Sequence, residues 1–145
     1  MRAALGSLFV IFPIAAAACG GPTAPSLRQV PPDHPIDRVD VVAADPAGNT
    51  TIAAGTQVTV RVTVRYELVG AETGTIGLVI QDQTNRCLAT CAVHQPVARG
   101  TGSLTLTETV QIPAAGVTGV NVFLPLFIGE QSVSRHMAAV HYNVR

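Results

Sequence analysis

The residues best suited to chemistry are two cysteines and a histidine, Cys87, Cys91 and His94, which form a C-x3-C-x2-H pattern. Thiolate and imidazole groups this close together are ligands that zinc and copper accept, but no fourth ligand is evident nearby. The spacing also differs from the C-x-x-C-H pattern of haem attachment. Because closely spaced thiols oxidise outside the cytoplasm, the sequence favours a Cys87–Cys91 disulfide that pins a local loop. A metal-binding or redox site at the same three residues is the alternative.

Other polar candidates lie on segments of alternating polarity. His136 and His141 are five residues apart on one expected strand, an odd separation that places them on opposite faces, so they are not expected to share a metal. Glu108 interrupts an apolar series. A lone buried carboxylate is costly, so we expect Glu108 at a sheet edge or a bulge. Glu108 and His136 are the pair that we would nominate for catalysis if this chain were an enzyme.

Catalytic signatures are missing from the sequence. There is no nucleophile elbow with an ordered Ser, His and Asp, no H-E-x-x-H pair and no glycine-rich phosphate loop. The chain contains no Lys, and its 9 arginines balance 9 acidic residues, so a nucleic-acid partner is not expected. Asp33, Asp37, Asp40 and Asp45 match no calcium loop. We therefore expect neither an enzyme nor a cofactor.

The N-terminus has the layout of an export signal. Met1 and Arg2 give it a positive start, residues 3–18 carry no charge, and small residues precede Cys19. The segment Ala16-Ala17-Ala18-Cys19 resembles the lipobox of bacterial lipoproteins. This resemblance implies removal of the signal peptide, residues 1–18, and attachment of a diacylglycerol carrying acyl chains such as palmitate to the Cys19 thiol.

Other residues of this N-terminal segment bear on where the protein is sorted and how the signal is processed. Gly20, directly after the cysteine, implies sorting to the outer membrane. Lipidation of Cys19 also explains the odd count of 3 cysteines, because it leaves Cys87 and Cys91 as a pair. An uncleaved membrane anchor is one alternative, although the apolar run is short for the ~20 residues required and contains Pro13. Cleavage at an ordinary Ala-x-Ala site, which releases a soluble protein, is the other.

The rest of the chain divides into a tether and a domain. Residues 19–35 are rich in proline, which predicts a lipid-anchored flexible tether without regular structure. Residues 36–145 show period-two alternation, clearest over residues 58–68, and no helical periodicity. Other runs cover 37–43, 75–82, 104–112, 119–127 and 138–144, with a seventh expected near 92–99. Glycines predict turns between them, including 70–74 and 100–102.

This series of strands predicts an all-β domain, a single antiparallel sandwich of about seven strands over residues 36–145. The order of the runs resembles bacterial immunoglobulin-like and fibronectin type III-like domains. The sequence departs from antibody domains in lacking their tryptophan and their inter-sheet cysteine pair. The resemblance implies a fold and assigns no activity.

One expected strand, residues 119–127, is largely apolar on both faces. Phe123 and Phe127 share one of these faces, and an exposed pair of rings there would form a partner surface. Burial beneath the Cys87–Cys91 loop is the alternative, and it is the one we favour. Pro125 cannot donate to a ladder, which predicts an edge strand or an irregular stretch.

These observations predict a non-enzymatic binding or structural module in the bacterial cell envelope. Its expected partners are the membrane, reached through the lipid on Cys19, and an envelope protein or glycan. Self-association through the strand of Phe123 is a further expectation.

Overall fold

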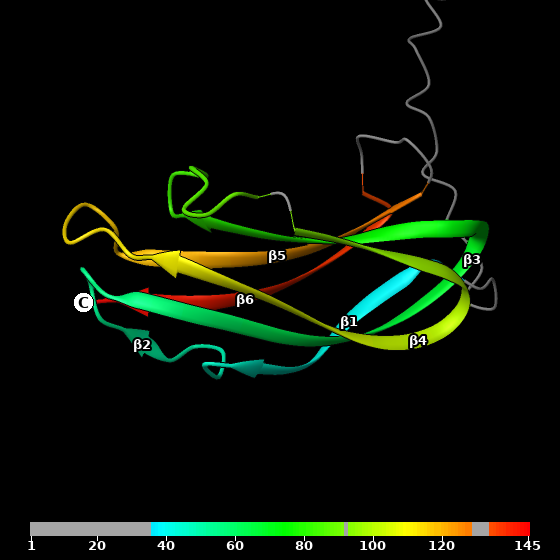
Figure 1. Ribbon diagram of the computed structural model, residues 1–145, viewed down its shortest axis with the longest axis horizontal. Coiled ribbons are helices and arrows are strands. Elements are labelled where there is room, and N and C mark those ends of the chain that lie inside the picture. Colours follow the sequence, from blue (N-terminus) through cyan, green and yellow to red (C-terminus); the bar gives the residue numbers. More distant parts are fainter. Residues whose placement is uncertain (1–35, 92, 129–133) are drawn as a thin grey trace, which may run out of the picture. The chain divides into compact units, whose positions relative to one another are not determined.

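The computed structural model describes residues 36–91, 93–128 and 134–145, and its regular structure there is entirely β (Figure 1). The all-β prediction is therefore confirmed. No helix that could span a membrane occurs among these residues. The signal peptide, Cys19 and the tether lie outside the described residues. The strands are β1 (Arg38–Asp45), β2 (Thr51–Ile52), β3 (Gln57–Asp82), β4 (Val93–Gln111), β5 (Gly119–Ile128) and β6 (His136–Val144).

The two longest strands, β3 and β4, each run through both halves of a curled sheet (Figure 1). Residues 57–68 of β3 pair with residues 100–111 of β4 on one side, and residues 61–67 of β3 pair with β1 on the other. The later residues of β3 pair with β5 and with the start of β4. The turns predicted at 70–74 and 100–102 are therefore wrong. These segments are bends inside continuous strands, where the β3–β4 register shifts between Leu68 and Thr73.

Two half-sheets result, which we call the first half and the second half. The first half contains β1, residues 57–68 of β3 and residues 100–111 of β4. The second half contains residues 73–82 of β3, residues 93–98 of β4, and the strands β5, β6 and β2. The short β2 pairs with β6 in parallel, so the expectation of a purely antiparallel sheet is wrong.

Both halves contribute side chains to one hydrophobic core, which gives the domain its sandwich character. On either side of the bend, even-numbered positions of β3 face inward, because alternate residues of a strand point to the same side. The Tyr142 ring is fully buried, and its hydroxyl donates a hydrogen bond of 2.8 Å to the Pro46 carbonyl. Fully buried core side chains are Val39, Val60, Val62, Val64, Leu68, Ile76, Leu78, Ile80, Ile112, Val120, Val122, Leu124, Leu126 and Tyr142.

The bends in the two long strands have separate causes. In β4 the bend falls at Gly100, whose φ of 112° lies in a region that side chains other than glycine rarely adopt. In β3 the bend is held by Asp37, the residue directly before β1, because one oxygen of its carboxylate accepts hydrogen bonds from the amides of Val69 and Gly70, each 2.8 Å long. Asp37, which the sequence left without a role, therefore fixes the geometry at which the two halves join.

Candidate functional site

The outer face of the second half is the strongest candidate for a site. Its members follow from strand alternation and from the pairing registers. None of them is Asp, Glu, Lys or Arg, and we call this surface the uncharged face. It includes Thr73, Thr75, Gly77, Val79, Gln81, His94, Pro96, Ala98, Asn121, Phe123, Pro125, Phe127, Met137, Ala139, His141 and Asn143.

A shallow groove of about 350 Å³ crosses the uncharged face. Phe123 lines it and lies opposite Val79 on β3 and Ala139 on β6. Phe127 lies opposite Thr75, and Met137, beside Pro125, is 52% exposed. The residues that line the groove are Val79, Gln81, Asn85, Phe123, Pro125, Phe127, Ser134 and Met137.

Both predicted aromatic residues therefore lie in an accessible groove. Phe123 and Phe127 are half-buried, and they share one outer face of β5 as their odd numbering predicts. Asn85 lines one wall, but no residue from 87 to 91 lines the groove. The expected burial beneath the Cys87–Cys91 loop is therefore not what the structure shows. The sequence missed Val79 and Met137, although both occupy the outward positions of their alternating runs.

Pro125 lies in an interior strand, because β5 pairs with β3 on one side and with β6 on the other. The expected edge position is wrong, but the alternative of an irregular stretch is confirmed, because the β3–β5 pairing is interrupted between Ile76↔Leu126 and Val79↔Phe123. The neighbouring strand shows how the proline is accommodated. A Cβ atom placed on Gly77 would lie 3.3 Å from Pro125 Cγ and 3.1 Å from His94 Cδ2. Gly77 therefore leaves room for the proline ring and the histidine ring to pack over the β3 backbone.

A row of polar side chains crosses one end of the uncharged face. Gln81 lies opposite Asn121, and Asn121 lies opposite His141 on β6. His141 Nδ1 and Asn121 Oδ1 are 2.8 Å apart. Amide side chains each carry donors and an acceptor, so this row can bind neutral polar groups of either kind.

The predicted disulfide between Cys87 and Cys91 is present. Its loop is attached to β3, where the Leu88 amide donates a hydrogen bond of 2.9 Å to the Ile80 carbonyl. His94 packs over Gly77 instead of joining the two sulfur atoms. Among the residues that the structure describes, no group of three His, Cys, Asp or Glu side chains is arranged to hold a metal.

Asp82 organises the turn that leads from β3 into this loop. Its carboxylate is buried and accepts hydrogen bonds from the Thr84 hydroxyl (2.6 Å), the Thr84 amide (2.8 Å), the Arg86 amide (3.1 Å) and Arg86 Nε (3.1 Å). These contacts, the Thr84 hydroxyl above all, lower the pKa of Asp82 to about 2 against the opposing effect of burial. The sequence did not reveal this role, although an Asp side chain that accepts a hydrogen bond from the backbone amide two residues later is typical of turns.

Glu108 ties the first half to the disulfide loop. Its Oε1 atom accepts hydrogen bonds from the Thr90 hydroxyl (2.7 Å) and the Thr90 amide (3.1 Å). The edge position predicted for Glu108 is confirmed, because β4 pairs only with β3 among the described strands. His136 is engaged elsewhere: its Nδ1 atom accepts a hydrogen bond of 3.2 Å from the Val39 amide. The structure thus does not bring together the two residues nominated for catalysis.

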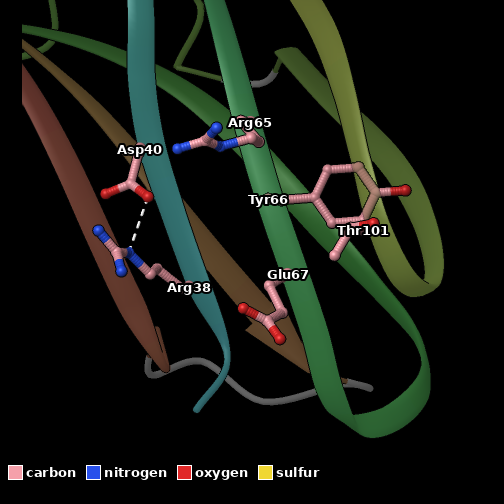
Figure 2. Close-up of a pocket in the computed structure, with 6 residues that line it drawn as sticks. All are labelled: Arg38, Asp40, Arg65, Tyr66, Glu67 and Thr101. Atoms are coloured by element: carbon pink, nitrogen blue, oxygen red, sulfur yellow. Dashed lines mark ion pairs between the residues drawn. The ribbon is translucent and has the colours of Figure 1, made fainter. Parts of the chain in front are cut away.

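A second, smaller depression of about 160 Å³ lies in the first half and is lined by charged side chains (Figure 2). Arg38 Nε and Asp40 Oδ2 form an ion pair of 2.7 Å, and the Tyr66 ring points away from them (Figure 2). Arg38 lies opposite Glu67, and Asp40 lies opposite Arg65. Since these charges balance across the strands, the depression offers no excess charge for an ionic ligand.

Parts of two kinds of glycoside hydrolase are similar in structure to this chain. No protein-family model and no curated protein matches its sequence. Two structures of a glycosyl hydrolase family 2 member from Bacteroides cellulosilyticus are similar at 13% identity and a TM-score of 0.48, covering 75% of this chain and 14% of the hydrolase. A family 123 glycoside hydrolase from Clostridium perfringens is similar at 9% identity and a TM-score of 0.32, covering 66% of this chain and 22% of that one. The chain is thus similar to small parts of much longer proteins, and this similarity assigns it no activity.

Proposed function

We propose that this chain is a lipid-anchored, non-enzymatic binding module of the bacterial cell envelope, which presents the uncharged face to its partner. The observation that carries this proposal is the groove over Phe123, Phe127 and Met137. An antiparallel sheet usually buries one face and exposes a polar one to water. Here both faces of β5 are largely apolar, as on surfaces that bind a partner.

The scaffold of the module is an immunoglobulin-like sandwich. The path of the chain supports this, because β3 and β4 each contribute one segment to each half. The two segments of each long strand, together with β1, β5 and β6, make seven strand segments, the number in a constant-type immunoglobulin domain. The short β2 adds an eighth segment at the edge of the second half.

The chemistry of the uncharged face sets the kind of partner. Its apolar centre, with the amides of Gln81, Asn85 and Asn121 beside it, suits a partner surface that is itself uncharged, because a buried unpaired charge is costly. An envelope protein with a neutral apolar patch and an uncharged glycan both have this character.

Attachment to the membrane rests on Cys19 and the preceding signal. A diacylglycerol on this thiol places two acyl chains in the bilayer, and each buried methylene contributes about 0.8 kcal/mol. Incorporation of radiolabelled palmitate into the wild-type chain, but not into Cys19→Ser, is the expected result. Incorporation that persists in Cys19→Ser contradicts the anchor.

Partner binding is tested by photo-crosslinking in intact envelopes. A photoreactive residue replaces Met137 at the groove, and a matched control replaces Thr59, which is exposed on the outer face of the first half. We expect an adduct from position 137 and none from position 59. A discrete band identifies a protein and a carbohydrate-positive smear identifies a glycan, whereas equal adducts from both positions contradict the proposal.

A further inference from the structure

Among the described strands, one long edge of the sheet carries little of the usual protection against pairing with another strand. β1 carries a bulge beside Val42, and its Val39 amide is bonded to His136. β2 is only two residues long, and the start of β4 contains Pro96. Bulges, short strands and proline all prevent strand addition. Residues 101–111 of β4 contain no proline and no basic residue, and their protection is limited to one inward-pointing charge, Glu108, which is held by its hydrogen bonds to Thr90.

The direction of the backbone groups along this edge follows from one hydrogen bond. The Ile112 amide donates to the Thr56 carbonyl at 2.9 Å, which places Ile112 in a hydrogen-bonded pair with β3. In an antiparallel ladder every second residue has this property. Even-numbered residues from 102 to 110 therefore bond to β3, and odd-numbered residues point their amides and carbonyls outward. No described strand pairs with these outward groups.

We propose that this edge binds the same edge of a second copy of the chain, with residues 101–109 antiparallel about a two-fold axis at Thr105. Each copy then extends the first half of the other as one continuous sheet. The site is distinct from the uncharged face, so the inference goes beyond the function proposed above.

The side chains support this register. Leu104, which is half-buried in the single chain, gains Leu106 of the second copy as its neighbour, and Glu108 lies opposite Gly102 instead of opposite another Glu108. On the outer side, Thr105 meets Thr105 and Ser103 meets Thr107. The same chemistry already joins β4 to β3, because the hydroxyl oxygens of Thr59 and Thr109, and of Thr63 and Thr105, are 2.9 Å apart. Threonine pairs of this kind stabilise antiparallel strands.

Cysteine crosslinking on the full chain in membranes tests the axis. Thr105→Cys places two thiols next to each other across the two-fold axis, where a short bis-maleimide joins them. Thr63→Cys is the matched control, because Thr63 lies directly opposite Thr105 on β3 and away from the edge. We expect a crosslinked homodimer from Thr105→Cys only. No dimer from a folded Thr105→Cys chain, or an adduct with a different protein instead, overturns the proposal.

A second pair of variants tests the backbone hydrogen bonds. On the Thr105→Cys chain, Thr107→Pro removes an outward amide and leaves the ladder to β3 intact, whereas Thr107→Val removes the hydroxyl and keeps the amide. The two-fold axis doubles each lost bond, so we expect Thr107→Pro to weaken crosslinking at least about tenfold and Thr107→Val to change it less than about threefold. Equal yields from two variants with matching circular dichroism contradict strand pairing at this edge.

Discussion

The outer face of the first half meets water through arginine, aspartate, glutamate and threonine side chains, whereas the uncharged face of the second half has an apolar centre. On the first half, opposite charges lie across from one another on β1 and β3, and threonine hydroxyls pair between β3 and β4. On the second half, polar side chains lie beside the groove over Phe123. On the first half, the charged groups and hydroxyls already have partners within the chain. The uncharged face instead retains accessible apolar surface for a partner to cover.

A charge placed in the groove is expected to have the largest effect, because it removes the apolar character that distinguishes the uncharged face from the first half. We expect Phe123→Glu to weaken partner binding by about 100-fold, because a groove-centred aromatic residue has the character of a binding hot spot. Loss of the photo-adduct at position 137 measures the effect. Thr59→Glu, which adds the same charge to the first half, is the control and retains the adduct. Full binding by Phe123→Glu contradicts the role given to the uncharged face.

The joint between the two halves is the next place to test. Asp37→Ala leaves the amides of Val69 and Gly70 without their acceptor, and we expect a loss of about 2 kcal/mol in the free energy of unfolding by urea. Asp40→Ala is the control, since Asp40 pairs with the exposed Arg38 and such pairs contribute at most about 1 kcal/mol. Equal losses from both substitutions exclude a special role for the bend.

The disulfide beside the uncharged face is expected to contribute about as much to the free energy of unfolding as Asp37 does. Replacing both Cys87 and Cys91 by Ser opens a small loop, so we expect the free energy of unfolding to fall by about 2 kcal/mol. Urea unfolding with and without reductant measures this. If the variant and the reduced wild-type chain are as stable as the oxidised chain, the loop contributes nothing to folding.

Acid titration measures how much the turn of Asp82 contributes to the stability of the second half. The pKa of Asp82 falls from 3.8 to about 2 on folding, so its contribution to stability is present above pH 3.8 and is lost as the pH falls towards about 2. We expect the urea midpoint to decline over this window in the wild-type chain and to decline less in Asp82→Asn. Identical pH profiles would show that the turn does not depend on this carboxylate.

The smallest expected effect lies on the first half. Thr59→Ala removes one exposed hydroxyl pair with Thr109, so we expect a loss of about 0.5 kcal/mol. Thr109→Ala should cost the same amount, and the double variant should cost little more, because both changes remove one interaction. A larger loss in either single variant would mean that this face contributes more to stability than its exposure suggests.

Alternation predicted the strands well but not their continuity. The run at 58–68 has the period of a half-buried strand, and the structure confirms the all-β class. The glycines at 70 and 74 indicate a turn when only neighbouring residues are considered. The bend that replaces this turn depends on Asp37 and on pairing with residues far along the chain, which local patterns do not encode.

The candidate site was predictable in part for the same reason. Phe123 and Phe127 share one face because their spacing is even, and this needs no knowledge of other strands. The interior position of Pro125 depends on the open space above Gly77 of β3, so it could not be read from β5 alone. The contact between Glu108 and Thr90 also joins residues brought together only by the curl of the sheet.

The path of β3 through both halves has a consequence for how the domain unfolds. Hydrogen bonds of β3 connect it to β1 and β4 before the bend and to β4 and β5 after it. Fraying of either half therefore removes pairing partners from the same strand that supports the other half. We expect amide hydrogens on both sides of the bend to exchange with solvent through one shared opening event, so that the domain behaves as a single cooperative unit.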